Sequence, residues 1–447
     1  MNVAVVGQGY VGLTAAACLA AAGHRVVGVE SDPARLASLE QGRIPFVEPG
    51  LPHLVLQGAE TGRLRFASAL SEATPVDAVV VAVGTPQLPT GNADLRQVAR
   101  ALNEVRELPA LPGLVLIKST MPPGTSARLL AETEPSAAFS RIYAYNPEFL
   151  SQGQTIRGWD RPSRIVVGLY EPGLLTAVRE LYKGIDAPWV VTTPTNAEMI
   201  KYASNAYLAT RISFINEIAN LCEEVGADVE EVAHGMQLDP RVGAGFLAAG
   251  VGYGGSCFPK DTRALTYLAS ARGRRMHLLE SVIRVNAAQH DLVRERLMHM
   301  IEGVREPLVA VLGLSFKPGT DDLREAPSLS VVPHLIGSGC AVRLWDPAVS
   351  GADRRPEFAG ASVSSSLYAA VRGAHAVLVL TEWPDIIDAN WERVATLMRR
   401  PRAVMDGRNC LNPARMVAAR FAYRGVGRLA VAGGNGSSEG ADGSAPE

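Results

Sequence analysis

The chain has 447 residues, of which 47% are hydrophobic and 20% charged, and its formal net charge is −2 at pH 7. This size and composition indicate a globular enzyme of two or three domains, and the small net charge gives no reason to expect nucleic acid or a membrane as a partner. No apolar run reaches the roughly 18 residues of a membrane span. The five scattered cysteines have the spacing of neither a zinc site nor a disulfide framework, so no metal is expected.

The first third of the chain alternates short apolar runs with helical stretches, which is typical of a parallel, doubly wound sheet. Strands are predicted at 3–6, 25–29, 77–83 and 113–118. Gly7, Gly9 and Gly12 form GxGxxG directly after the first strand. In a dinucleotide site these glycines allow a tight turn, close approach of pyrophosphate, and tight helix–strand packing. A glycine turn with a purely structural role is the alternative.

Glu30 ends the second predicted strand, at the spacing where a carboxylate receives the ribose hydroxyls of a dinucleotide. A carboxylate at this place repels a 2′-phosphate, so the sequence favours NAD over NADP. Arg35, close by, is the feature that would suit NADP.

A long helix is predicted from a capping box of Thr195 and Glu198 to a stop at Gly226. Lys201 and Asn205 are four residues apart and therefore share a face of this helix. In a cleft, such a pair could stabilise a developing oxyanion. Spacing alone favours the other interpretation, an exposed helix surface.

Further polar residues come after two predicted turns. Glu148 and Gln152 lie four apart after Asn146–Pro147 and supply a carboxylate and an amide together. Thr120, in KSTMPPGT, ends another strand, where it could orient a water molecule or the cofactor.

Cys257 lies in the run GYGGSCFPKD (252–261), among small residues and just before Lys260 and Asp261. A thiol attacks carbonyls as the thiolate, and its usual pKa of about 8.5 must be lowered by positive charge or dipoles. Lys260 could supply that charge. Together with a dinucleotide site, this thiol suggests oxidation through a thioester.

Strand-like runs return at 309–312, 341–345, 376–380 and 403–405, and VAVLG (309–313) echoes VAVVG (3–7). We interpret this region as a second αβ domain of related topology. It lacks the dinucleotide glycines, so a second NAD site is not expected. Lys317 at the end of its first strand suits a phosphorylated ligand, and a solvated lysine is the alternative. The small, polar segment 431–447 is predicted to be a disordered tail.

Taken together, these motifs closely resemble the nucleotide-sugar dehydrogenase family of UDP-glucose 6-dehydrogenases and GDP-mannose dehydrogenases. The resemblance runs from Met1 to about Asn412. Its carriers are GQGYVGL (7–13), VGTP (83–86), KSTMPPGT (118–125), NPEFL (146–150), EMIKYASNAYLATRISFINE (198–217), GYGGSCFPKD (252–261) and FKPGTDDLRE (316–325).

The resemblance implies an α/β fold of two Rossmann-like, doubly wound parallel-sheet domains joined by a long central helix and a helical domain. The expected domains are an NAD-binding domain (1–195), a central helical and dimerisation domain with the cysteine loop (196–300), a UDP-sugar-binding domain (301–430) and the tail (431–447). A homodimer or larger homo-oligomer is expected. Because the N-terminus begins directly with a strand-like run, without a leader, we expect a cytoplasmic, reduced protein.

The implied reaction is a four-electron oxidation of a nucleotide sugar by two NAD⁺ in turn, most simply UDP-glucose to UDP-glucuronate. Cys257 would attack the aldehyde, and a thiohemiacetal would become a thioester that water hydrolyses. Lys201 and Asn205 would stabilise the oxyanion, Asp261 and Thr120 would manage protons and the water, and Glu148 would join the same polar network.

The resemblance also implies two sets of binding residues. The NAD site would use Gly7, Gly9, Val11, Gly12, Glu30, Arg35, Thr85, Thr120, Gln152, Lys260 and Arg324. The nucleotide sugar would contact Glu148, Gln152, Lys201, Asn205, the run Phe246, Leu247 to Gly250, Gly254, Lys317, Arg408, and Arg241 from the neighbouring subunit.

Gln152 departs from the family pattern, which commonly has a second glutamate there; an amide cannot act as a base.

Related alternatives are a GDP-mannose or a UDP-N-acetylhexosamine dehydrogenase. Two-electron β-hydroxyacid dehydrogenases need neither Cys257 nor the region of Lys317. A nucleotide-sugar-binding regulator built on a decayed enzyme would be expected to lack the thiol or the lysine.

Overall fold

The computed structural model describes residues 1–133 and 138–428, and the predicted tail lies outside these residues. The chain divides into two compact units. The first unit contains Met1–Thr210, Gly254–Arg284 and Lys317–Glu325, and the second contains Arg211–Tyr253, Val285–Phe316 and the chain from Ala326 onward. In the described part of the chain, no helix is long and apolar enough to cross a membrane.

The first unit is built on an eight-stranded sheet with the order β3-β2-β1-β4-β5-β6-β7-β8. Every neighbouring pair is parallel except β6 and β7, which are antiparallel. The strands are β1 Asn2–Val6, β2 Arg25–Val29, β3 Leu64–Ala67, β4 Ala78–Val81, β5 Leu114–Ile117, β6 Tyr143–Tyr145, β7 Ile165–Leu169 and β8 Trp189–Thr192. Its first six strands have the dinucleotide-fold order.

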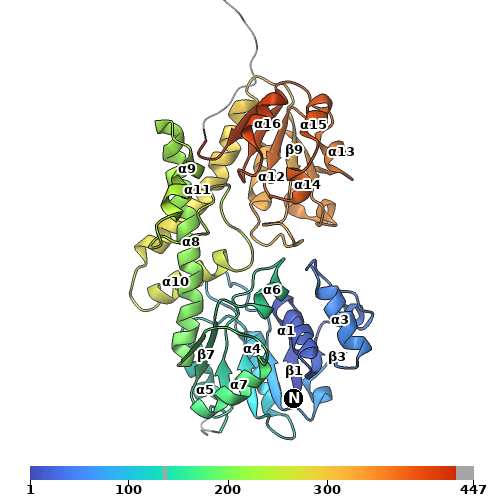
Figure 1. The fold of residues 1–447 in the computed structure, drawn as a ribbon, viewed down its shortest axis with the longest axis vertical. Helices are drawn as coiled ribbons and strands as arrows, with labels where there is room; N and C mark the ends of the chain where they lie inside the picture. The colour runs from blue at the N-terminus through green and yellow to red at the C-terminus, as the bar shows by residue number, and fades with distance from the viewer. Residues whose placement is uncertain (134–137, 429–447) are drawn as a thin grey trace, which may run out of the picture. The chain divides into compact units, whose positions relative to one another are not determined.

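Helices cover both faces of this sheet (Figure 1). Alternate residues of β1 show why: Val3 and Val5 belong to one buried core, and Ala4 and Val6 belong to another. A strand buried on both faces must be apolar along its whole length, as these runs are. The helices are α1 Tyr10–Ala21, α2 Pro33–Glu40, α3 Leu51–Glu60, α4 Arg96–Arg106, α5 Thr125–Thr133, α6 Thr155–Asp160 and α7 Leu175–Leu181.

The second unit repeats this plan with a six-stranded, all-parallel sheet in the order β11-β10-β9-β12-β13-β14. Numbered from its first strand, this is again the order 3-2-1-4-5-6. The strands are β9 Leu308–Leu312, β10 Ala341–Trp345, β11 Ser362–Val363, β12 Ala376–Val379, β13 Ala403–Asp406 and β14 Ala422–Gly425. The helices are α12 Pro327–Gly337, α13 Leu367–Val371, α14 Pro384–Ile387, α15 Trp391–Leu397 and α16 Pro413–Ala418. The predicted fold class is therefore confirmed.

A long helix, α8 (Pro194–Val225), contributes residues to both units (Figure 1). After it come α9 Val229–Gln237, α10 Phe258–Ser270 and α11 His277–Met300. The predicted stop at Gly226 is confirmed, because this residue takes φ +76°, a conformation that favours glycine.

The predicted capping box at the start of α8 is wrong. The helix begins at Pro194, and the Thr193 hydroxyl accepts a hydrogen bond from the Asn196 amide at 3.3 Å. Glu198 is fully buried and bonds to a different helix. Proline at the first helical position, with a threonine before it, is a recognised helix start, so Thr193 and Thr195, two residues apart, each precede a possible start.

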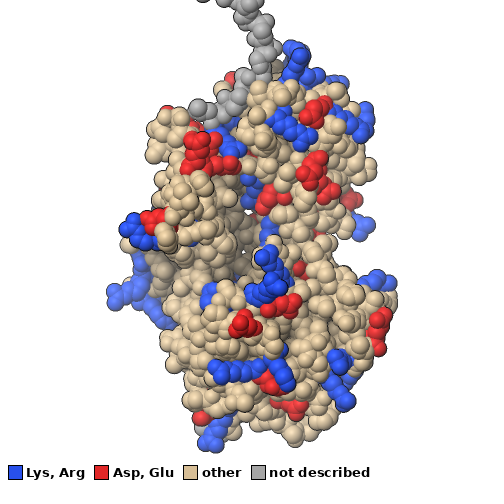
Figure 2. All heavy atoms as spheres, viewed as in Figure 1, with Lys and Arg blue, Asp and Glu red and all other residues tan. Residues whose placement is uncertain are grey.

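The face of the molecule in Figure 2 shows Lys and Arg interspersed with Asp and Glu, without one extended patch of either sign. This distribution agrees with the small net charge of −2.

Candidate active site

The glycines after β1 have the three geometries that a dinucleotide turn requires. Gly7 has φ +90°, and a Cβ on Gly12 would lie 1.7 Å from the Gly7 carbonyl oxygen. A Cβ on Gly9 would meet nothing within 4 Å, so the backbone at the start of α1 is open to a ligand. The first and third glycines therefore serve the fold, whereas the second leaves room for a pyrophosphate at the helix N-terminus. Val11 lies in the first turn of the same helix.

Glu30 comes directly after β2 and is 6% exposed. Its carboxylate accepts hydrogen bonds from the backbone amides of Gln8 at 3.3 Å and Asp32 at 3.0 Å. The Arg35 guanidinium lies 3.4 Å from it. Glu30 is thus held at the carboxyl end of the strand next to the glycine turn, where the sequence placed it. Arg35 pairs with this carboxylate.

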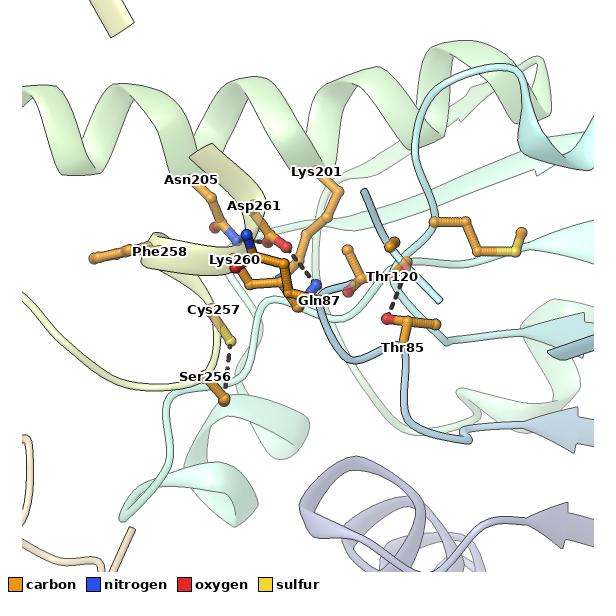
Figure 3. Close-up of polar contacts among 12 residues, drawn as sticks. Thr85, Gln87, Thr120, Lys201, Asn205, Ser256, Cys257, Phe258, Lys260 and Asp261 are labelled. Carbon is orange, nitrogen blue, oxygen red and sulfur yellow. Dashed lines mark hydrogen bonds and ion pairs between the residues drawn. The ribbon is translucent and has the colours of Figure 1, made fainter. Parts of the chain in front are cut away.

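Thr85 and Thr120 come after the neighbouring strands β4 and β5. The Thr85 hydroxyl donates to the Thr120 carbonyl at 2.9 Å and joins the two loops (Figure 3). Because β4 and β5 are parallel neighbours, both loops leave the same edge of the sheet. The glycine turn after β1 leaves that edge too.

Lys201 and Glu148 form a buried ion pair in the first unit. The Lys201 ammonium donates to the Glu148 carboxylate at 2.9 Å and to its backbone carbonyl at 2.7 Å. The second carboxylate oxygen accepts from the Leu150 amide at 2.6 Å. Burial disfavours both charges and is the largest single influence on each pKa, but the contributions of the neighbouring groups together exceed it. The pKa of Lys201 is raised by Glu148, and the pKa of Glu148 is lowered by Lys201.

Asn205, one turn further along α8, points at Asp261 on α10. Its amide donates to one Asp261 carboxylate oxygen at 2.6 Å, and the Lys260 ammonium donates to the other at 2.5 Å (Figure 3). Lys201, Asn205 and Asp261 are at most 6% exposed. The spacing-based interpretation of Lys201 and Asn205 as an exposed helix surface is therefore wrong.

Cys257 is the N-cap residue of α10, and its thiol lies 3.7 Å from the Ser256 hydroxyl (Figure 3). Burial raises the thiol's pKa above its usual value, and the positive charge of Lys201 opposes this rise most strongly. Lys260 also lowers the pKa of this thiol, as expected, but less than Lys201 does, and its ammonium is paired with Asp261. We call Cys257, Lys201, Glu148, Asn205 and Asp261 the thiol cluster.

Several other predicted ligand contacts also lie in the first unit. The Lys317 ammonium donates to the Ser151 hydroxyl at 2.7 Å. Arg324 makes a bidentate pair with Asp322 at 2.6 Å and 2.9 Å, and its carbonyl accepts from the Gly255 amide, next to the predicted Gly254. Gln152 has a buried Oε1 atom with no hydrogen-bond partner among the described residues.

The remaining predicted sugar-nucleotide contacts lie in the second unit. Phe246 is 46% exposed and takes φ +58°, which is unusual for a residue with a side chain. Leu247 is 5% exposed. The Gly250 amide donates to Asn216 at 2.9 Å, and a Cβ on Gly250 would lie 2.7 Å from the Gly407 carbonyl. The segment 246–250 is therefore held tightly at its glycine end and open at its phenylalanine.

The two predicted substrate arginines, Arg408 and Arg241, differ in their contacts and exposure. The Arg408 guanidinium donates to the backbone carbonyls of Leu380, Gly252 and Phe316 at 2.7–3.2 Å. In this structure it therefore organises loops of the second unit. Arg241 is 90% exposed and pairs with Asp239 two residues away. Such exposure leaves it available to another molecule.

Sequence reasoning missed a buried network beneath Glu148. The Lys118 ammonium donates to Asn146 and to the Tyr182 hydroxyl, each at 2.8 Å, and lies 5.3 Å from the ring centroid of Trp159. These residues and Glu148 line a cavity of about 200 Å³. Lys118 and Asn146 stand inside quoted motifs, but their mutual contact depends on two strands meeting, which spacing along the chain does not reveal.

Sequence comparison identifies the chain's relatives. Residues 1–186 match the profile of the UDP-glucose/GDP-mannose dehydrogenase family, NAD binding domain, residues 195–288 its central domain, and residues 310–413 its UDP binding domain. The chain is 40% identical to a UDP-glucose 6-dehydrogenase of Pseudomonas aeruginosa, with 96% of this chain and 98% of the relative covered. It is 39% identical to the UDP-glucose 6-dehydrogenase YwqF of Bacillus subtilis, with the same coverage.

Comparison with solved structures finds the same kind of protein as the sequence comparison. A UDP-glucose dehydrogenase from the archaeon Pyrobaculum islandicum superposes with a TM-score of 0.85 at 35% identity, covering 96% of this chain and 98% of that one. The profile of the first domain also confirms the predicted cofactor, NAD. The three matches succeed one another along the chain, and they include its glycine turn, its thiol and most of its second αβ sheet. The chain is an NAD-dependent member of the UDP-glucose/GDP-mannose dehydrogenase family.

Proposed function

We propose that the chain oxidises UDP-glucose to UDP-glucuronate through a thioester on Cys257. The observation that carries this proposal is the thiol cluster, in which a cysteine at a helix N-terminus is combined with a buried lysine in the unit that holds the NAD turn. The names of the relatives at 39–40% identity favour UDP-glucose over other sugar nucleotides.

The first oxidation converts the sugar's C6 alcohol to an aldehyde. When bound, NAD⁺ accepts one hydride from C6 in each of the two oxidations. Lys201 and Asn205 are assigned to the C6 oxygen, to which a buried ammonium and an amide can offer charge and a hydrogen bond. Glu148 holds Lys201 in place through the 2.9 Å contact and keeps it charged.

The second oxidation passes through Cys257. Its sulfur attacks C6 of the aldehyde and forms a C–S bond, and the carbonyl oxygen takes a proton to give a thiohemiacetal. Loss of a hydride from C6 and of the hydroxyl proton then gives a thioester. Because burial raises the thiol's pKa, the thiolate forms only with help from Lys201 and the N-terminus of α10.

Hydrolysis breaks the C–S bond and returns the thiol. Water supplies the second carboxylate oxygen, and Asp261 with Thr120 are assigned to orient it and receive its proton. Gln152 cannot act as a base. Glu148 is engaged by Lys201 and Leu150. Asp261 is likewise engaged, by Asn205 and Lys260, so its assignment to this proton follows the family resemblance.

The nucleotide part of the substrate is assigned to the residues that the family resemblance names. These are the segment 246–250, Gly254, Lys317 and Arg408, with Arg241 acting from a neighbouring subunit. Lys317 reaches Ser151 beside Gln152, which supports a role next to the thiol cluster. The boundaries 1–195, 196–300 and 301–430 remain our proposal for the functional domains.

A cytoplasmic homodimer is the proposed form of the enzyme. Exposed apolar side chains recur every seventh residue along α8, at Tyr207, Phe214 and Leu221, with exposures of 60%, 44% and 58%. Seven residues are almost two helical turns, so these side chains form one stripe suited to a second copy. None of the five cysteines forms a disulfide within the described chain, which suits a reducing compartment.

The test of the proposed function is a screen of NADH release over UDP-glucose, GDP-mannose and UDP-N-acetylhexosamines. UDP-glucose is expected to give the highest kcat/KM and about two NADH per sugar consumed. Release of one NADH with an aldehyde product would overturn the four-electron assignment. Higher activity with another sugar would overturn the substrate.

A Cys257→Ser variant separates the two oxidations. It is expected to release at most about one NADH per sugar, because a hydroxyl does not form the thioester. Product analysis by mass spectrometry distinguishes aldehyde from carboxylate. If the variant makes UDP-glucuronate at the wild-type rate, the thioester route is wrong.

A further inference from the structure

Glu198 is a buried carboxylate to which the reaction above gives no role. It lies on α8, three residues before Lys201, and is 0% exposed. Residues three apart on a helix share a face, so Glu198 and Lys201 project from the same side of α8. Burying a carboxylate is unfavourable unless hydrogen bonds compensate for its lost hydration, so its partners matter.

The hydrogen bonds to Glu198 come from the start of α5. One carboxylate oxygen accepts from the Gly124 amide at 2.6 Å, and the other accepts from the Ser126 amide at 2.8 Å and the Ser126 hydroxyl at 2.6 Å. The first amides of a helix lack partners within the helix. Glu198 therefore caps α5 from a helix 72 residues away in sequence.

This cap holds the loop that carries Thr120. The loop leaves β5 at Ile117 and enters α5 at Thr125, and Thr120 stands between. On its other side, the loop is bonded to β6, where the Tyr145 hydroxyl accepts from the Met121 amide at 3.3 Å and the Tyr143 hydroxyl contacts the Ser126 hydroxyl at 2.7 Å. Glu198 is thus the link between this loop and the helix of Lys201 and Asn205.

We propose that Glu198 is a positioning residue that sets the Thr120 loop against Lys201 and Asn205 for the reaction. A carboxylate suits this role because it only accepts hydrogen bonds, and the groups of α5 that bond to it are all donors. An amide at this place would direct two N–H groups at donors. The proposal rests on the proposed dehydrogenase function.

The first test is Glu198→Gln, assayed with UDP-glucose and NAD. A displaced loop is expected to lower kcat roughly tenfold to a hundredfold, since misplacement of about 1 Å can have that effect, while KM for the sugar changes less than threefold. The matched control is Asp228→Asn, the same change from carboxylate to amide at the residue that caps α9 by accepting from the Glu230 amide, where asparagine caps a helix about as well as aspartate. The control is expected to keep wild-type kcat. Equal kcat in wild type and Glu198→Gln would overturn the proposal.

A milder change guards against misfolding. Ser126→Ala removes one donor and leaves both backbone bonds, and kcat is expected to fall about threefold to tenfold without loss of folded protein. In the double variant, the combined loss should be smaller than the product of the two single losses, because the two residues share one contact. If the two losses in kcat simply multiply, Glu198 and Ser126 do not act through their shared contact.

The pH dependence of kcat is a further test, because a purely structural role of Glu198 would leave it unchanged. The ionisable groups that interact with Glu198 are tyrosines, namely Tyr143 and Tyr145 from β6, Tyr170 after β7 and Tyr202 on α8. Burial raises the pKa of Glu198 above its usual range. As pH falls through that raised pKa, protonation adds a donor and kcat should drop. This acid limb should be absent from Glu198→Gln, and its persistence there would contradict the assignment.

Hydrogen exchange tests the geometry without activity. In Glu198→Gln, peptides covering 121–130 should exchange faster, because the amides of Gly124 and Ser126 lose a carboxylate acceptor. Unchanged exchange would overturn the cap itself. If the wild type releases no NADH with any sugar, the proposed function is wrong. If the wild type is active and Glu198→Gln changes neither kcat nor exchange, only the proposed role of Glu198 is wrong.

Discussion

The thiol at the centre of the candidate site is governed by the charges buried around it. Desolvation of Cys257 disfavours the thiolate, and Lys201 is the main opposing charge. Glu148, whose carboxylate lies 2.9 Å from the Lys201 ammonium, and Asp261 disfavour the thiolate further. The free enzyme therefore keeps the thiol mostly protonated, which protects it from oxidation. When the thiol attacks the aldehyde, negative charge develops on the aldehyde oxygen. The Lys201 ammonium can stabilise that charge and so favours the attack.

A prediction at this scale concerns the alkylation of Cys257 by iodoacetamide. The rate should rise with pH through a pKa above the usual thiol value, and Lys201→Met should raise that pKa further, because the strongest stabilising charge is lost. Below the pKa, each unit of rise slows alkylation about tenfold. Peptide mapping by mass spectrometry monitors Cys257 apart from the other cysteines.

Lys260→Met is the comparison for this experiment. Its charge lowers the thiol's pKa less than that of Lys201 does, and its ammonium is paired with Asp261. A smaller shift is therefore expected. A larger shift in this variant than in Lys201→Met would show that the lysine just after the thiol in the sequence activates it, as the motif suggested.

At the scale of elements, the site is made by the turns at the ends of parallel strands. The loops after β1, β4, β5 and β6 carry the glycine turn, Thr85, Thr120 and Glu148, and α8 supplies Lys201 and Asn205. Because the first sheet is parallel across these strands, all four loops leave one edge. Ligands of such sheets bind outside this edge.

The glycine turn yields a prediction that separates folding from binding. Gly9→Ala should fold normally, because its Cβ meets nothing within 4 Å and its φ of −79° suits alanine. It should still lose NAD affinity, since the Cβ occupies the approach of the pyrophosphate. Gly12→Ala should destabilise the first unit, because its Cβ would lie 1.7 Å from a carbonyl oxygen.

Thermal unfolding and titration with NAD check both variants. The expected pattern is a Tm for Gly9→Ala within a few degrees of wild type with at least about tenfold weaker NAD binding, equal to 1.4 kcal/mol. A lowered Tm is expected for Gly12→Ala. Unaltered NAD binding by Gly9→Ala would place the cofactor elsewhere.

At the scale of the whole molecule, the chain contains two sheets whose first six strands share one order, and the sheets differ in the turn after their first strand. After β1 come the open glycines of the NAD turn. After β9 comes Gly313, where φ is +85° and a Cβ would lie 2.5 Å from Thr381, and then Leu314. The second sheet thus keeps the tight turn of a nucleotide-binding fold, but it lacks the open glycine that lets a pyrophosphate approach the backbone. This difference accounts for one NAD domain and one UDP domain in the family assignment.

The apolar stripe on α8 gives a prediction about assembly. Phe214→Glu places a charge in the centre of the stripe, and light scattering after size-exclusion chromatography should show the mass falling toward that of one chain. Leu278→Glu is the control, because Leu278 is an exposed leucine on α11, 70% exposed, outside the stripe. An unchanged mass for Phe214→Glu would remove α8 as the dimer interface.

The sequence by itself determined eight of the strands in their order along the chain, whereas β3, β6, β7, β8, β11 and β14 were not predicted. The strands β2 and β10 have the predicted bounds, and other predicted strands differ by one or two residues at their ends. The reason is physical: strands buried on both faces must be continuous apolar runs, and GxGxxG needs its glycines for steric reasons that hold in any such turn. Long motifs in a consistent order were likewise enough to identify the family.

Tertiary structure alone decided how the polar side chains pair. Lys201 and Asn205 could have been exposed on spacing grounds, Lys260 could have faced the thiol, and Glu198 could have capped its own helix. Instead Lys201 meets Glu148, Lys260 meets Asp261, and Glu198 caps α5. Such pairings depend on which buried donors and acceptors meet when distant segments pack, because each buried charge must find a partner in space, and spacing along the chain carries no information about that partner.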